Sequence, residues 1–88
     1  MNLRVREFLN TGQFVCEIED SDGKWHTFIN QHTKEIGLFP AQGCANMFKP
    51  LFFGQCKSLD IATSEGAIAY YGCIPSEQWE NNKLTLEA

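Results

Sequence analysis

The residues best suited to chemistry in this sequence are four cysteines and two histidines. They are Cys16, Cys44, Cys56, Cys73, His26 and His32. Local pairs such as Cys-x-x-Cys let two ligands reach one zinc ion from a single turn, and none of these residues forms such a pair. We therefore expect no metal and no cofactor. The simplest interpretation is four small, reduced and mostly buried thiols.

Cys44 is the one candidate nucleophile, with His26 or His32 as its base. A helix N-terminus stabilises a thiolate, and Cys44 falls near the start of a predicted helix. However, Cys44 is in register with Met47 and Phe48, so we expect the thiol to face the core. The chain also lacks the motifs of nucleophile elbows, phosphate loops, dinucleotide sites and zinc proteases. We expect a non-enzymatic protein with no catalytic residue.

Composition and charge narrow the possible partners. The 88 residues carry seven basic and eleven acidic side chains, a net charge of −4, which argues against binding nucleic acid. Hydrophobic residues make up 43%, as in an ordinary globular domain, so we expect one domain over 1–88 with a flexible tail at 83–88. Neither a signal-peptide run nor a span of about 20 apolar residues occurs, so we expect a cytoplasmic chain without membrane contact.

The first third of the chain is predicted to form an antiparallel three-strand meander, which would position Cys16 and His26. Alternating apolar and polar residues predict strands at 3–8, 14–19 and 24–29. Turn residues separate them, at Asn10-Thr11-Gly12 and at Asp20-Ser21-Asp22-Gly23. In the second strand, Glu17 and Glu19 alternate with apolar residues, so we expect both carboxylates to face water.

The rest of the chain predicts a short helical centre followed by a return to strand. A helical turn is expected at 30–35 and a helix at 40–50, opened by Pro40 and stopped by Pro50. Alternation then predicts a second β-hairpin, with strands at 57–61 and 67–71 around a turn at 63–66. Pro75 opens a C-terminal helical turn. The predicted fold class is α+β.

Aromatic residues are numerous for so short a chain and concentrate in its second half. In the predicted strand, Tyr70 and Tyr71 point to opposite faces, so both need cover from the fold or from a partner. Exposed aromatics are common anchors of protein interfaces. We therefore expect a protein-interaction module, with a protein partner or self-association as a possible homodimer. The candidate contact residues are Trp25, Phe48, Phe52, Phe53, Tyr70, Tyr71 and Trp79.

An alternative function is the binding of a small apolar ligand. Its pocket would lie between the helical centre and the sheet. The lining would come from Trp25, Phe48, Phe52 and Tyr70.

Three short motifs resemble a family of short α+β proteins of unknown function. They are Gly37-Leu38-Phe39, Phe48-Lys49-Pro50-Leu51, and Tyr70-Tyr71-Gly72 with Pro75. The family usually carries Trp-Pro where Tyr70-Tyr71 stand. Its members are often encoded beside a small toxin-like protein. The resemblance therefore implies an antitoxin-like or mobile-element accessory role and no established enzyme activity.

Overall fold

The computed structural model describes residues 1–81, in which four strands form one antiparallel sheet with three helices around it. The strands are β1 (Leu3–Glu7), β2 (Phe14–Glu19), β3 (Trp25–Thr27) and β4 (Ile74–Pro75), in the sheet order β1-β2-β3-β4. The helices are α1 (Gln42–Ser58), α2 (Ser64–Tyr71) and α3 (Glu77–Asn81). The α+β class and the meander are confirmed. The tail predicted at 83–88 lies outside the described residues.

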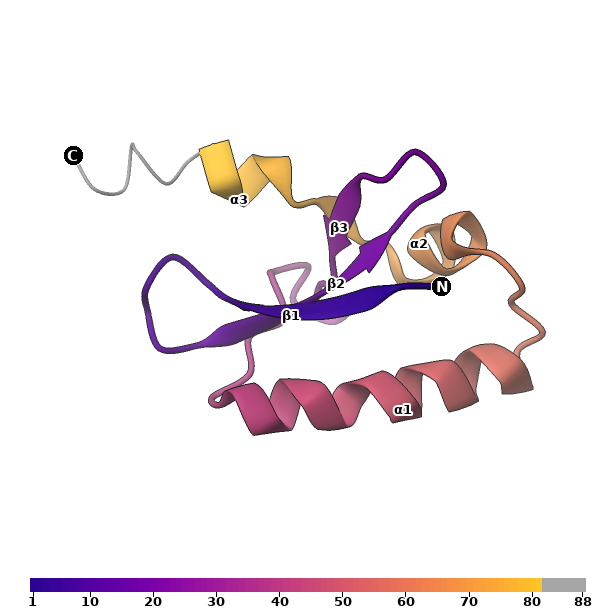
Figure 1. Cartoon of the computed structure of the whole chain (residues 1–88), viewed down its shortest axis with the longest axis horizontal. Helices are drawn as coiled ribbons and strands as arrows, with labels where there is room; N and C mark the ends of the chain where they lie inside the picture. Colours follow the sequence, from indigo (N-terminus) through magenta and orange to yellow (C-terminus); the bar gives the residue numbers. More distant parts are fainter. Residues whose placement is uncertain (82–88) are drawn as a thin grey trace.

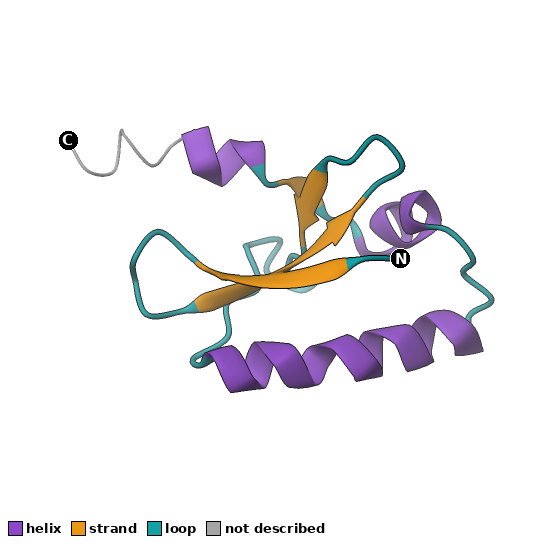
Figure 2. Ribbon diagram, viewed as in Figure 1, coloured by secondary structure: helices purple, strands orange, loops and turns teal. Residues whose placement is uncertain are grey.

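The helices lie on different sides of the sheet. Figure 1 shows α1 running beneath the strands, α2 at one end of the sheet and α3 on the side away from α1. The colouring in Figure 2 separates the strands from these helices and from the long connection that precedes α1. One face of the sheet therefore packs against α1, and the other lies beside α3.

The two predicted turns of the meander are confirmed. At the second turn, the Asp20 backbone N–H donates to the Lys24 carbonyl at 2.9 Å, and the Asp20 carboxylate accepts from the backbone N–H groups of Asp22 and Lys24. Gly23 has a φ of 82°, in the left-handed region that a residue without Cβ adopts at little cost. The turn residues thus fix the register of β2 against β3.

The prediction that Pro50 ends the central helix is wrong. α1 continues through Pro50 to Ser58 and is 17 residues long. A proline inside a helix removes one backbone hydrogen bond and costs about 3 kcal/mol. The apolar spacing nevertheless continues past it, because Ala45, Phe52 and Cys56 are all buried against the sheet. Burial of this face offsets the cost of the proline.

The predicted second β-hairpin is also wrong, because its first strand falls on the end of α1 and the turn that follows, and its second lies in the helix α2. Thr63 caps α2, its Oγ1 accepting from the Gly66 backbone N–H at 3.0 Å, and Gly72 ends the helix with a φ of 70°. The face that packs inward has helical spacing, with Ala67 buried and Ile68 and Tyr71 half-buried. Tyr70 and Tyr71 therefore do not lie on opposite faces of a strand.

Two smaller predictions need correction. Residues 30–35 form a hydrogen-bonded loop rather than a helical turn, and a β-bridge between Ile29 and Ile36 closes it. A helical turn does follow at the C-terminal end, but Pro75 belongs to β4 and the turn itself is α3.

The hydrophobic core lies between the sheet and the two longer helices. Its centre is Phe28, which packs edge-on to Phe48 and Phe52 with ring centroids 5.1 and 5.0 Å apart. Edge-to-face contacts of this kind stabilise a core beyond simple burial. The buried cluster is made of Cys16, Ile18, Phe28, Ala45, Phe52, Cys56 and Ala67.

Candidate interaction surface and polar cluster

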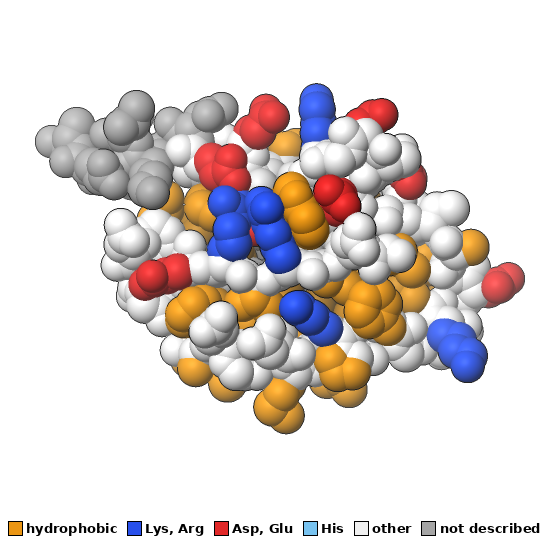
Figure 3. Space-filling view, viewed as in Figure 1, with side chains coloured by type: hydrophobic (Ala, Val, Ile, Leu, Met, Phe, Trp, Pro, Cys, Tyr) orange, Lys and Arg blue, Asp and Glu red, His pale blue; other side chains and the backbone are white. Residues whose placement is uncertain are grey.

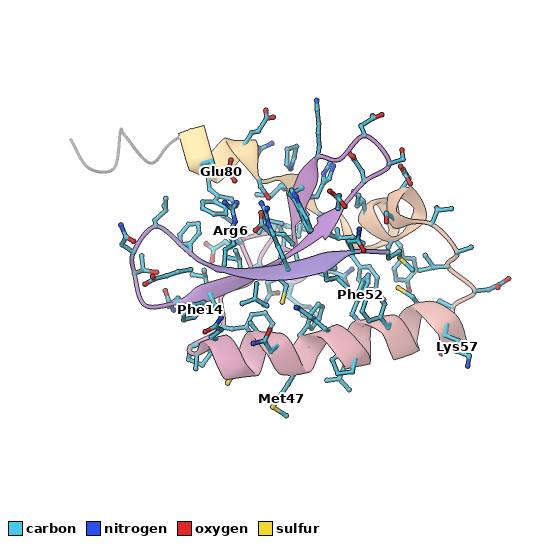
Figure 4. All side chains as sticks on the ribbon, viewed as in Figure 1. Arg6, Phe14, Met47, Phe52, Lys57 and Glu80 are labelled. Carbon is cyan, nitrogen blue, oxygen red and sulfur yellow. The ribbon has the colours of Figure 1, made fainter. Side chains whose placement is uncertain are left out.

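The side of α1 that points away from the sheet is apolar and exposed. Met47 is 70% exposed and Leu51 is 71% exposed. In Figure 4, Met47 points away from the sheet while Phe52 points towards it. We call this surface the outer face of α1. It consists of residues that follow one another at helical spacing, namely Gly43, Met47, Pro50, Leu51 and Gly54.

No residue of the outer face carries a charge. α1 as a whole contains no acid, and its two lysines are Lys49, which is half-buried, and Lys57 near the C-terminal end. A surface helix normally presents charged side chains on the side away from the core. The orange hydrophobic side chains along the lower edge of Figure 3 lie over this helix. The outer face is thus an apolar surface left without a partner in the described chain.

Two glycines in α1 have no packing explanation within the chain. A Cβ placed on Gly43 or on Gly54 would meet no atom within 4 Å. A glycine inside a helix costs about 1 kcal/mol relative to alanine. Neither glycine is therefore required for the fold of the described residues, although both allow another backbone to approach closely.

The seven aromatic residues predicted to make contacts do not form one surface. Phe52 and Trp79 are buried, and Trp25, Phe48 and Tyr71 are half-buried. Phe53 and Tyr70 remain exposed, at 40% and 56%. The fold itself covers Tyr71, whose ring packs against Phe28 and Phe52.

Sequence reasoning missed Met47 and Leu51. The signal was present in the spacing of residues 43, 47, 50, 51 and 54. It was hidden because a helix that stops at Pro50 never completes that face.

The opposite face of the sheet carries a buried carboxylate. Glu17, expected to face water, has no exposed surface. Arg4 and Arg6 on β1 both reach it, with Nε to Oε1 distances of 3.0 and 2.5 Å, and the Ser76 hydroxyl donates to its Oε2 at 2.5 Å. Two arginines and a serine therefore compensate the buried charge.

The helix α3 closes this polar cluster. The Trp79 indole N–H donates to the Thr27 hydroxyl at 2.7 Å, and that hydroxyl lies 2.8 Å from the Ser76 hydroxyl. Arg6 also pairs with Glu80, and Figure 4 shows these two side chains pointing towards each other. The Arg6 guanidinium lies 4.8 Å from the Trp79 ring centroid. The cluster thus fastens α3 to the sheet.

The environment keeps Glu17 ionised. Burial acts to raise its pKa, but the hydrogen bonds from Arg6, Arg4 and Ser76 outweigh burial and the pKa is lowered from its ordinary value. A general acid needs the opposite shift. Glu17 therefore stabilises the fold as an anion at neutral pH.

A polar cleft of about 570 Å³ lies beside this cluster, at the end of the β2–β3 hairpin. Arg4, Trp25, His26, Ser76 and Glu80 are among its lining residues. Three of its side chains, Arg4, Asp20 and Glu80, are already paired. Arg4 contacts Glu17 and stacks 4.1 Å from the Trp25 centroid, while His26 Nε2 lies 2.8 Å from a carboxylate oxygen of Asp20.

The hydrogen bond to His26 is the main cause that lowers the pKa of Asp20, followed by the backbone hydrogen bond from Lys24. The Asp20 carboxylate and the His26 ring therefore stabilise the β2–β3 hairpin.

The pocket predicted between helix and sheet is not formed by its predicted lining. Trp25 lines the polar cleft, on the sheet face away from α1, and Phe52 is fully packed in the core. Of the four predicted residues, Phe48 alone lines the apolar cavity that does occur between the 28–39 segment and the helices. Tyr71 lines this cavity in place of its neighbour Tyr70.

The four thiols occupy different environments. Cys16 and Cys56 are buried, Cys73 is half-buried, and Cys44 is exposed, so the expectation that Cys44 faces the core is wrong. Burial raises the pKa of Cys16 to about 11 and that of Cys73 to about 12. Among the described residues, no hydrogen bond joins Cys44 to a histidine.

Metal-ligand clusters and membrane-spanning helices are both absent from residues 1–81. No group of three or more His, Cys, Asp or Glu side chains in this range is placed to hold a metal ion. None of the described helices is long and apolar enough to cross a membrane.

Comparisons of the chain with family models, with curated proteins and with solved structures find no match. The resemblance to short α+β proteins stays a prediction. Function must therefore be argued from the surface and the cavities of this chain.

Proposed function

We propose that this protein is a non-enzymatic protein-interaction module that uses the outer face of α1 to bind a second copy of itself. The observation that carries the proposal is the exposure of Met47 and Leu51 on a helix face without charge. Exposed apolar patches on otherwise polar proteins commonly mark contact sites. Burial of these two side chains in a dimer would remove their apolar surface from water.

Charge favours the outer face over the rest of the surface for contact between two copies. The chain has a net charge of −4, so most approaches of one copy to another bring like charges together. The outer face is free of charge, and contact through it avoids this repulsion. A two-fold contact uses the same patch on both copies, and an antiparallel pair of α1 helices sets Met47 of one copy beside Leu51 of the other. Gly43 and Gly54 would allow the two backbones to approach closely.

The size of the outer face sets the expected affinity of the dimer. A helix of 17 residues is about 25 Å long. A stable interface buries about 800 Å² on each partner, which is more than one helix face supplies. Phe53 and Tyr70 are exposed as well and could widen the contact. We therefore expect a weak dimer that forms and dissociates with concentration.

Sedimentation velocity over a range from micromolar to millimolar protein tests this proposal. The wild-type chain should shift from monomer to dimer, and a Met47→Glu/Leu51→Glu variant should stay monomeric. The matched control is Lys24→Glu/Lys34→Glu, which also adds acids at exposed positions but outside α1, and which should still dimerise at high salt. A wild-type chain that remains monomeric at millimolar concentration, or a double-glutamate variant that dimerises equally, would contradict the proposal.

An antitoxin-like or mobile-element accessory role is one use of such a module. It is supported by the family resemblance alone. The same proposal places the chain in a reducing compartment such as the cytoplasm, where its four free thiols would stay reduced.

A further inference from the structure

The apolar cavity between the 28–39 segment and the helices has a volume of about 260 Å³. Its walls include four aromatic rings, and its remaining lining includes no Asp, Glu, Lys or Arg side chain. The lining residues are Phe28, Ile29, Gln31, His32, Gly37, Phe39, Phe48 and Tyr71. A cavity of this composition favours a neutral apolar molecule over an ion.

The rings pack against one another at steep angles, and all four residues line the cavity. Phe28 lies 71° to Phe48 and 62° to Tyr71, and Phe39 lies 50° to Phe48. Aromatic pairs prefer offset-stacked or edge-to-face contacts, and such an arrangement offers both to a flat molecule. The shape of the walls therefore suits a planar ring.

The rim of the cavity is fixed before any ligand arrives. The Asn30 backbone N–H donates to the Glu35 carbonyl at 2.7 Å, and the Asn30 side-chain oxygen accepts from the His32 and Thr33 backbone N–H groups. The Gly37 N–H donates to the Phe28 carbonyl at 3.0 Å. A preformed rim lowers the entropic cost of binding.

Size and polarity define the class of ligand. A cavity of about 150 Å³ lined by apolar residues holds benzene, so 260 Å³ has room for two fused rings. His32 and Gln31 line the cavity while remaining exposed, and neither side chain has a hydrogen bond within residues 1–81. They can bind one polar group at the edge of the guest.

We propose that this cavity binds a free, neutral, planar aromatic molecule of one or two fused rings, with a single hydrogen-bonding group directed to His32. This site is independent of the outer face of α1, which shares none of its lining residues.

Titration of the ¹⁵N-labelled chain with indole, read by amide chemical shifts, tests the proposal. Saturable shifts are expected for amides of residues 28–39 and around Phe48 and Tyr71. His32→Ala should weaken indole roughly five-fold, through loss of one hydrogen bond, and leave the affinity for naphthalene unchanged. Lys34→Gln, in the same loop but outside the lining, should change neither affinity.

A variant that fills the cavity separates true occupancy from surface adsorption. Phe39→Trp adds volume from one wall, and it should abolish the indole shifts while the spectrum stays that of a folded protein. Absence of saturable shifts in the cavity up to the solubility limit of indole would overturn the proposal. So would equal binding by a folded Phe39→Trp variant, or binding of N-acetyl-tryptophan amide that is tighter than that of indole, which would assign the site to a peptide side chain.

Discussion

Arg6 reaches across the first β-hairpin to Glu17, and its Nε lies 2.5 Å from an oxygen of a carboxylate that has no exposed surface. The same guanidinium pairs with Glu80 on α3. Arg6 therefore connects the buried centre of one sheet face to the last described helix. This connection makes the cluster the clearest target for measurements of stability.

Glu17→Gln should destabilise the protein by about 3 kcal/mol, at the lower end of the range for breaking a buried ion pair. The lower end applies because Arg4 and Arg6 are each about one-third exposed and can recover some hydration. Glu80→Gln is the matched control and should cost at most about 1 kcal/mol, as for an exposed pair. Urea unfolding of both variants measures the difference, and equal losses would contradict the buried role of Glu17.

Acid should lower the free energy of unfolding, and part of this loss should depend on Glu17. Its pKa in the folded state lies below the ordinary value of 4.5, so the stability it contributes is complete above about pH 4.5. That contribution is lost as the pH falls through the lowered folded pKa. Free energies of unfolding measured between pH 7 and pH 3 should fall less steeply for Glu17→Gln than for wild type. Parallel curves would exclude Glu17 as a source of the acid sensitivity.

Gly54→Ala should have opposite effects on the fold and on the proposed dimer. The added methyl group meets no atom of the chain, so the monomer should gain about 1 kcal/mol from better helix propensity. Between two α1 helices the same methyl group would keep the backbones apart, and dimerisation should weaken. Unfolding at micromolar concentration and sedimentation at millimolar concentration give the two results. A variant that gains stability and dimerises more tightly would argue against close approach at Gly54.

The four thiols should react at two distinct rates. Cys44 is exposed and should react quickly with an aromatic disulfide reagent at neutral pH, whereas Cys16 and Cys73, with pKa values raised by burial, should react only as the protein opens. One thiol is expected in the fast phase, and Cys44→Ser should remove it. Two or more fast thiols in the native protein would contradict the burial described above.

The meander was predictable because its signals are local. The alternation in β2 and the Asp22-Gly23 dipeptide specify a hairpin without reference to the rest of the chain. The second half depends on tertiary contacts. Burial of Phe52 and Cys56 carries α1 through Pro50, and a short run such as residues 67–71 fits either a strand or a helix until its neighbours are known.

The candidate sites also divide into features that follow from local sequence and features that depend on distant contacts. Glu17 looked like a solvated strand residue because its compensation comes from Arg4 and Arg6 on β1 and from Ser76, which is 59 residues further along the chain. Arg4 lies opposite Glu17 in the register of β1 and β2, and Arg6 lies two residues further on the same face, so both contacts follow from the hairpin. The contact with the Ser76 hydroxyl does not, because it depends on how β4 returns to the sheet.

The most direct test of the central claim is to dilute the ¹⁵N-labelled chain from millimolar to micromolar concentration and follow every amide. If the outer face of α1 is the contact surface, the shifts that change with concentration will cluster at residues 43–54, with smaller changes near Tyr70. The polar cluster around Glu17 will not change. Concentration-dependent shifts centred on the β2–β3 hairpin or on α3, with residues 43–54 unaffected, would contradict the account.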